Sequence, residues 1–368
     1  MTDILDVNAH LHTPYSFSAF RDIPQALDLA AQQGVKVVGI NDFYSLDGYK
    51  EWDTECRRRS LFPLFNIEMI SLNAEDQAAG LRVNDPNNPG RTYLSGKGLS
   101  YPVILKGEEA AQLQAVKAES NAQVEKMCSK LNAHLQACKA PFTLSYEKVL
   151  AGLTKGSVRE RHLAKALRLE AEKVFAGDAL SAFYSEICGK AFKSAADNAA
   201  AVENELRGAL LKAGGAAFVP EEASAFLPME TVQKIMKAAG GIPTYPFLAD
   251  DAKGNFTDFE ADLQKCADIL RNRGINSVEF ITTRNTTAVL ESYASYLQDE
   301  GFVVTFGSEH NTPALEPVKL RTRDNADGLS EKLREINYRG ACAVAAHQAG
   351  LDVKCIEEGH NLIQKAIQ

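Results

Sequence analysis

The sequence predicts an α/β barrel of parallel strands, or a related closed sheet, that carries a large helical insertion. Strand and helix patterns alternate over residues 1–72, and the alternation resumes near residue 229. The stretch between them is rich in Ala, Lys and Glu and has helical periodicity. Repeated strand–helix–strand order implies parallel strands with right-handed crossovers. An open, doubly wound sheet remains the alternative at this point.

Local signals justify the N-terminal elements. The segment 4–12 (ILDVNAHLH) predicts the first strand. The segment 22–33 predicts a helix, because Asp22 can cap its start, Pro24 suits the first turn and Gly34 can end it. The next elements are expected to be a β-branched strand at 35–42, a short helix at 47–59 and a third strand at 61–72.

The C-terminal part repeats the same rhythm after a helix that ends in MKAAGG. Expected strands lie at 241–248, 277–282 and 302–309, and expected helices at 258–273, 285–299, 328–350 and 353–367. At least six strand–helix units therefore flank the middle of the chain. We expect residues 1–72 and 229–368 to form the barrel and residues 73–228 to form a loop and helical insertion domain.

Composition describes an ordinary globular chain. The 368 residues are 45 % hydrophobic and 24 % charged, and the formal net charge of −8 argues against broad nucleic-acid binding. The seven cysteines form no CxxC pair, which is typical of reduced thiols in a cytosolic protein. No signal peptide and no membrane-spanning apolar run is visible in the sequence. We therefore expect a cytoplasmic protein without a membrane partner.

Two histidines at the end of the first strand are the leading candidates for chemistry. His10 and His12 are two residues apart, so on a strand they project to the same side. They lie at the C-terminal end of the strand, which is where parallel barrels form their sites. A metal-binding pair and a pair of hydrogen-bonded structural histidines both fit this spacing.

Acidic and imidazole side chains also end the other predicted strands. Asp42 ends the second strand, Glu68 lies in the third, and Glu309 and His310 end the last. Carboxylates beside imidazoles suit zinc, manganese or iron. We expect one divalent ion or none, with His10, His12, Glu68 and Glu309 as its ligands. Asp42, which would orient a histidine, and His310 are the catalytic candidates.

A turn-rich stretch at 84–102 follows the third strand. It places Arg91 and Lys97 among glycines, whose backbone N–H groups can approach an anion closely. Because the stretch leaves the same end of the barrel as His10, it predicts an anion-binding loop with Arg91 and Lys97 as substrate contacts. A mobile surface loop is the alternative interpretation.

Five short motifs together resemble the polymerase and histidinol phosphatase (PHP) superfamily of metal-dependent phosphoesterases. They lie within 6–72 and 236–312 and leave out the insertion. The motifs are NAHLHTPYS, GINDFYSLDGY, PLFNIEMIS, GGIPTYPFL and TFGSEHN. The resemblance implies a distorted barrel of seven β/α units. It places His10 and His12 on metal ligands, Asp42 on the motif aspartate, Glu68 on the bridging glutamate and Glu309 on the closing aspartate.

The chain departs from the family pattern at four positions. Asn8 replaces the leading aspartate, while Phe43, Tyr245 and Asn311 replace imidazoles. Phe cannot bind a metal, so the usual three-metal site is incomplete. The resemblance thus implies a metal-dependent phosphoesterase with a mononuclear site, acting on a small phosphorylated molecule. The alternative is a catalytically inactive PHP-like binding or regulatory protein. The insertion could serve as a lid, a homo-oligomer interface or a docking arm.

Overall fold

The computed structural model describes residues 3–368 and contains a sheet that curves into a nearly closed barrel. The strand order is β1-β2-β3-β4-β6-β7-β8, and the short strand β5 pairs with β3. A parallel bridge between Leu11 and Glu309 links the two ends of this order. The strands are β1 (Asp6–Leu11), β2 (Val35–Phe43), β3 (Phe62–Leu72), β4 (Arg91–Lys97), β5 (Leu227–Pro228), β6 (Ile242–Phe247), β7 (Ser277–Ile281) and β8 (Val303–Gly307). The predicted α/β barrel class is confirmed.

Strand β4 corrects one expectation. Residues 84–102 were expected to form a loop, but β4 runs antiparallel between β3 and β6 and makes the sheet mixed. Gly90 and Gly98 flank the strand with φ of 76° and 63°, so the glycines mark turns at its two ends. The strand itself is short, and five of its seven residues are buried. Lys97 therefore lies in the sheet.

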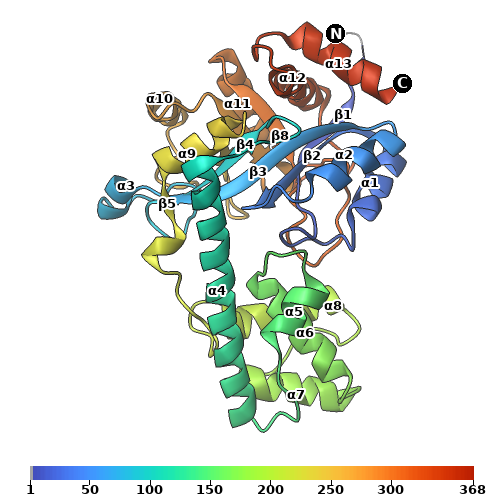
Figure 1. Ribbon diagram of the computed structural model, residues 1–368, viewed down its shortest axis with the longest axis vertical. Helices are drawn as coiled ribbons and strands as arrows, with labels where there is room; N and C mark the ends of the chain where they lie inside the picture. Colours follow the sequence, from blue (N-terminus) through green and yellow to red (C-terminus); the bar gives the residue numbers. More distant parts are fainter. Residues whose placement is uncertain (1–2) are drawn as a thin grey trace.

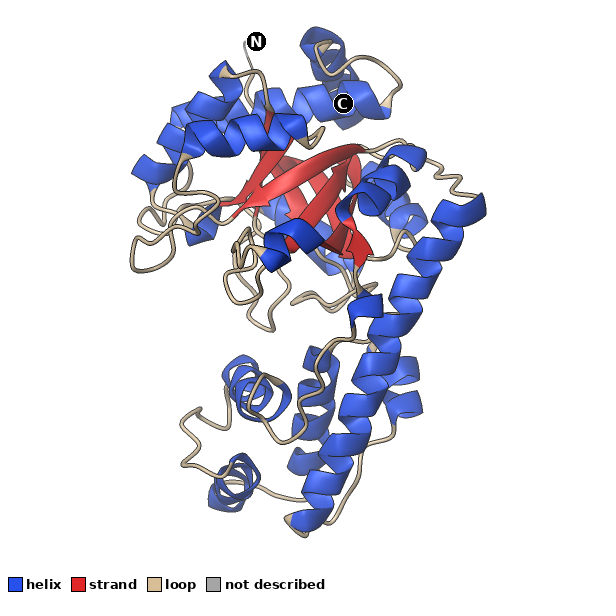
Figure 2. Ribbon diagram, turned by 90° about the vertical axis from the view of Figure 1, so that its left-hand side faces the viewer, coloured by secondary structure: helices blue, strands red, loops and turns tan. Residues whose placement is uncertain are grey.

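Helices cover the outside of the barrel, as Figure 2 shows around the red strands. Asp22 caps α1 as expected, since its side chain accepts a hydrogen bond from the Gln25 amide at 2.8 Å. The helices around the sheet are α1 (Ile23–Gln32), α2 (Tyr49–Arg58), α3 (Ala74–Ala78), α9 (Met229–Ala238), α10 (Leu263–Asn272), α11 (Thr287–Asp299), α12 (Glu331–Gln348) and α13 (Ile356–Ile367). A short 3₁₀ turn, Thr282–Arg284, follows β7.

The inserted helices form a second lobe with its own core. Helix α4 (Gly107–Ala137) runs from the barrel into this lobe (Figure 1), and Leu113 packs in the barrel core while Leu131 packs in the lobe core. The other helices of the lobe are α5 (Tyr146–Leu153), α6 (Glu160–Glu172), α7 (Asp178–Cys188), α8 (Ala199–Leu206) and the π-helical turn Arg207–Leu211. A 3₁₀ turn at Ala223–Ala225 leads back towards β5. The proposed division at residues 73 and 228 stays a prediction.

Ion pairs and aromatic contacts hold the lobe against the barrel. Lys117 pairs with Asp47 at 2.6 Å, and Lys155 pairs with Glu51 at 2.8 Å. His162 of α6 packs edge-on against Phe17, with ring centroids 4.9 Å apart.

Within residues 3–368 no helix, α4 included, is both long enough and apolar enough to cross a bilayer.

Candidate metal centre and its cavity

The histidine pair lies where the sequence predicts. His10 is in β1 and His12 directly follows it, and both side chains are fully buried. Their Nε2 atoms are 3.2 Å apart, and the rings meet edge-on with centroids at 5.0 Å. The two-residue spacing on an extended strand therefore brings two imidazole nitrogens to one point, as the alternation of a strand requires.

Glu68 of β3 supplies a third donor at this point. Its Oε2 lies 3.1 Å from His12 Nε2 and 3.5 Å from His10 Nε2, and it is buried with no hydrogen-bond donor. The three donor atoms all lie within 4.8 Å of one another. Two imidazole nitrogens and a carboxylate oxygen are ligands that zinc, manganese and iron accept. The unsatisfied carboxylate oxygen and this donor set both fit a divalent metal ion.

The electrostatics of the group favour a cation between the three side chains. Burial alone would raise the pKa of the Glu68 carboxyl, but the close imidazoles outweigh it and lower this pKa to about 2. Burial would lower the pKa of His10, but Glu279 reverses the effect and raises it to about 9. The carboxylates around His10 thus stabilise positive charge at the place where the three donors meet.

Glu279 of β7 is the member of the site that the sequence motifs did not reveal. Its Oε2 lies 3.0 Å from His10 Nδ1 and 2.6 Å from Lys97 Nζ, and the Ser95 hydroxyl donates to its other oxygen. Burial would raise the pKa of Glu279, but Lys97 and His10 hold it well below its usual range. A carboxylate on the far nitrogen of a histidine fixes the tautomer that a metal needs. The signal for it was a charge inside the apolar strand 277-SVEFI-281.

Lys97 does not lie on an exposed loop. It is fully buried in β4, where Nζ contacts Glu279 and donates to the Ala9 carbonyl at 3.1 Å. Burial lowers its pKa in spite of the Glu279 carboxylate. The ammonium does not line the cavity described below, so the geometry supports a role in holding Glu279, in place of the expected substrate contact.

Asp42 is linked to His12 through the hydroxyl group of Ser16. It is buried and accepts hydrogen bonds from the Thr13 amide at 2.7 Å and the Ser16 hydroxyl at 2.6 Å. The same Ser16 oxygen lies 3.3 Å from His12 Nδ1. Burial raises the pKa of Asp42 against the opposing effects of His12 and these donors. Asp42 therefore reaches His12 through Ser16.

Glu309 and His310 lie apart from the three-residue group. Glu309 receives both of its contacts from Arg284, at 2.8 Å to each carboxylate oxygen. His310 has Nδ1 2.8 Å from the Ser308 hydroxyl and Nε2 2.8 Å from the Glu316 carbonyl, so both ring nitrogens are occupied. Burial lowers the pKa of His310. Neither residue joins His10, His12 and Glu68, so a fourth ligand from the last strand is not preformed.

Two of the side chains that stand where the PHP motifs have imidazoles, Phe43 and Tyr245, have other partners. Phe43 stacks on His12 with centroids 5.0 Å apart and planes at 14°, and it pairs with Glu68 in the β2–β3 register. The Tyr245 hydroxyl donates to Glu260 at 2.7 Å. Phe43 thus covers one face of the His12 ring, and Phe43 itself lines the cavity described next.

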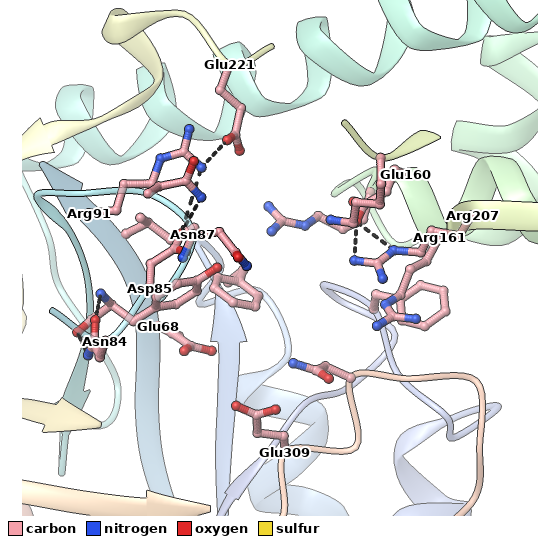
Figure 3. A pocket seen from close by; sticks show the side chains of 18 of the residues that line it. Glu68, Asn84, Asp85, Asn87, Arg91, Glu160, Arg161, Arg207, Glu221 and Glu309 are labelled. Carbon is pink, nitrogen blue, oxygen red and sulfur yellow. Dashed lines mark hydrogen bonds and ion pairs between the residues drawn. The ribbon is translucent and has the colours of Figure 1, made fainter. Parts of the chain in front are cut away.

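A cavity of about 490 Å³ lies between the barrel mouth and the inserted lobe. Figure 3 shows Glu68 and Glu309 on the barrel side and Glu160, Arg161 and Arg207 on the opposite side. Glu68 is the member of the metal group that lines it. Arg91, expected as a substrate contact, lines it too, but pairs with Glu221 at 2.6 Å. Six cationic side chains line the cavity (Arg91, Arg159, Arg161, Arg207, Lys212 and Arg284), together with five carboxylates (Glu68, Asp85, Glu160, Glu221 and Glu309).

Comparisons with known proteins identify the fold. No protein-family profile and no curated protein sequence matches the chain. A candidate metal-dependent phosphoesterase from Bifidobacterium adolescentis has a TM-score of 0.56 at 17 % identity, over 91 % of this chain and 96 % of that one. An amidohydrolase from Chromobacterium violaceum, solved with sulfate and no metal, has a TM-score of 0.56 at 14 % identity, over 90 % and 95 %.

The likeness is one of fold. It covers more of the chain than residues 1–72 and 229–368 can supply, so it extends into the inserted helices. The chain therefore shares its fold with these two proteins and has a buried His–His–Glu group that could hold a metal ion.

Proposed function

We propose that this protein is a divergent member of the PHP superfamily that hydrolyses a phosphate ester with one bound metal ion. The observation that carries the proposal is the convergence of His10 Nε2, His12 Nε2 and Glu68 Oε2 beside a cavity whose lining has six cations and five carboxylates. The sequence motifs and the fold of the two similar structures support it.

The chain's own residues prepare the site for such an ion. Glu279 faces His10 Nδ1 and would hold a proton there, so that Nε2, which lies 2.9 Å from the Asn41 amide nitrogen, would turn its lone pair to the metal ion. Lys97 holds Glu279, and Ser16 orients His12. A Zn, Mn or Fe ion bound there would supply a Lewis acid that activates water and offsets phosphoryl charge.

The cavity fits a small phosphorylated molecule. Its volume of about 490 Å³ lies in the range of small-molecule sites. Arginine side chains bind phosphate oxygens with two parallel hydrogen bonds, and five of the six lining cations are arginines. A ligand held there would have its phosphoryl group between the lobe and Glu68.

A non-catalytic binding protein is the second candidate. The stacking of Phe43 on His12 favours it, because an apolar ring occupies space beside the donor group. The hydrogen bond that Tyr245 donates to Glu260 also favours the binding protein, because it engages the Tyr245 hydroxyl with a residue other than a metal ion. In this case the cavity would bind a phosphorylated ligand without turning it over.

Metal content and turnover separate the two candidates. Protein purified without added metal should contain near-stoichiometric Zn, Mn or Fe, and His12→Ala and Glu68→Gln should lose it. The wild type should hydrolyse 4-nitrophenyl phosphate with one of these metals, and both variants should be inactive. His360→Ala is the matched control, because His360 contacts Tyr338 on α12, outside the metal group. Metal binding without turnover with any of the three ions would favour the binding protein; wild-type protein that binds no metal would refute the hydrolase.

A further inference from the structure

The cations of the cavity divide into paired and unpaired side chains. Four have a carboxylate partner within 3.0 Å: Arg91 with Glu221, Arg207 and Lys212 with Glu160, and Arg284 with Glu309. Among residues 3–368, no carboxylate lies within the ion-pair distance of 4.0 Å from Arg159 or Arg161. These two arginines, at the start of α6, therefore bring positive charge into the cavity without a matching anion.

Arg159 and Arg161 are held by aromatic rings and single neutral hydrogen bonds. The Arg159 guanidinium lies 4.6 Å from the Phe43 ring centroid and donates to the Ser120 hydroxyl at 3.2 Å. The Arg161 guanidinium lies 5.6 Å from the Phe17 ring centroid and donates to Asn204 at 3.0 Å. A guanidinium has five N–H donors, so most of them remain available on both side chains.

The charge at Arg161 is poorly compensated. Burial and the neighbouring Arg207 lower its pKa to about 10, although Glu160 and Glu309 act in the opposite direction. For Arg159, burial also opposes the charge, but Glu160 raises its pKa. Glu160 is shared by Arg207 and Lys212 at the same time, so one carboxylate serves several cations on this side. An added oxyanion would relieve this excess of positive charge.

Phe43 connects these arginines to the metal group. One aromatic ring stacks on His12 and also carries the Arg159 guanidinium. Phe43 and Glu68 are register neighbours in β2 and β3, and both line the cavity with the two arginines. Phe43 cannot bind a metal ion, and the Arg159 guanidinium over its ring brings positive charge to this place.

We propose that Arg159 and Arg161 form an oxyanion-binding pair, through which the inserted lobe binds the phosphoryl group of the ligand opposite Glu68. The assignment rests on the proposed phosphorylated ligand, and it adds that recognition comes from the insertion. The pair would serve the hydrolase and the binding protein alike, because it needs no metal. Each guanidinium would direct N–H donors at the phosphate oxygens while it keeps its contact with an aromatic ring.

Inorganic phosphate is the probe for this pair, measured by calorimetric titration of full-length protein in excess chelator. Arg159→Gln and Arg161→Gln should each weaken phosphate binding roughly tenfold to hundredfold, the range for a hydrogen-bonded charge. Arg159→Lys should fall in between, because it keeps the charge and loses the fork. Arg58→Gln removes one charge from an exposed helix and should leave binding unchanged.

The results separate this inference from the proposed hydrolysis. Wild-type affinity in both Gln variants, or no phosphate uptake by the wild type at millimolar concentration, would overturn the pair. Wild-type affinity together with easier proteolysis of the lobe would assign the arginines to holding the lobe. Weakened binding without turnover in any metal would support the pair and refute the hydrolase. Turnover that needs His12 but neither arginine would support the hydrolase alone.

Discussion

Replacing Lys97 with Met tests whether the buried ion pair between Lys97 and Glu279 supports His10. Lys97 Nζ lies 2.6 Å from Glu279 Oε2, and neither side chain has exposed surface. Glu279 in turn contacts His10 Nδ1 at 3.0 Å. Met fills most of the volume of Lys, so the main effect is a buried carboxylate that loses its closest cation.

The structure sets the size of the effect. The attraction between unit charges 2.6 Å apart is roughly 6 kcal/mol at an effective dielectric constant of about 20. Much of it offsets desolvation, and removing one partner of a buried pair costs about 3–5 kcal/mol. His10, whose pKa is raised to about 9, remains beside Glu279 and compensates part of the loss. We therefore expect a decrease of about 3 kcal/mol in the free energy of unfolding.

Urea unfolding at pH 7 in excess chelator measures this decrease. Trp52 is the single tryptophan and is fully buried in the barrel, so its fluorescence follows the barrel and not the lobe. Lys332→Met is the control, because Lys332 is an exposed residue of α12, which packs on the barrel. It should change stability by less than about 0.5 kcal/mol.

A double-mutant cycle with Glu279→Gln shows whether the loss comes from charge. The double variant Lys97→Met with Glu279→Gln should cost about 2–3 kcal/mol less than the sum of the single variants, because it buries no unpaired carboxylate. Equal stability of Lys97→Met and the wild type, or additive single effects, would refute the account of a buried pair that supports His10.

Three further predictions concern the acid stability of the lobe, the packing at Gly307 and the effect of zinc on stability. His162 is buried and its pKa is lowered to about 3, mainly by burial, so the unfolded state binds more protons between pH 6.5 and pH 3. Stability of the lobe should therefore fall as pH drops below about 6.5, by up to roughly 5 kcal/mol. His162→Gln keeps a cap acceptor for the Arg159 amide and should lose this acid sensitivity by circular dichroism; parallel pH profiles would contradict the assignment. A Cβ at Gly307 would overlap His10 Cβ, so Gly307→Ala should cost about 1–3 kcal/mol and weaken metal binding, whereas Gly152→Ala, with open space around it, should not. Zinc at about 100 times its Kd should add about 2.7 kcal/mol of stability to the wild type, and no such gain is expected for Glu68→Gln.

Most of the barrel could be predicted from local pattern. Six of the strands lie within two residues of their expected bounds, because β-branched runs between helix signals are specific for parallel α/β units. Strand β4 escaped detection, since the glycines around it resemble a loop and one of its two pairing partners, β6, is distant in sequence. A short strand without clear alternation is specified by its neighbours more than by its own residues.

The site could be predicted in part. The pair His10 and His12 and the glutamate Glu68 could be named from strand positions, because strand ends converge in a barrel. Glu309 lies at a similar strand end, yet it is paired with Arg284. Glu279 could not be assigned a role. A charged residue within an apolar strand indicates that the charge is buried and needs a partner, but it does not indicate which residue that partner is.

The sequence by itself determined the strand–helix rhythm, the helical insertion and the two histidines that point to one side at the end of β1, because these follow from periods of two and 3.6 residues. Only the tertiary structure decided that Lys97 lies in the sheet beside Glu279 and that Arg159 lies on Phe43. Those contacts join residues up to 182 positions apart in the chain. Side-chain chemistry states what a residue can bind, but the closing of the barrel and the placing of the lobe decide which partner it meets.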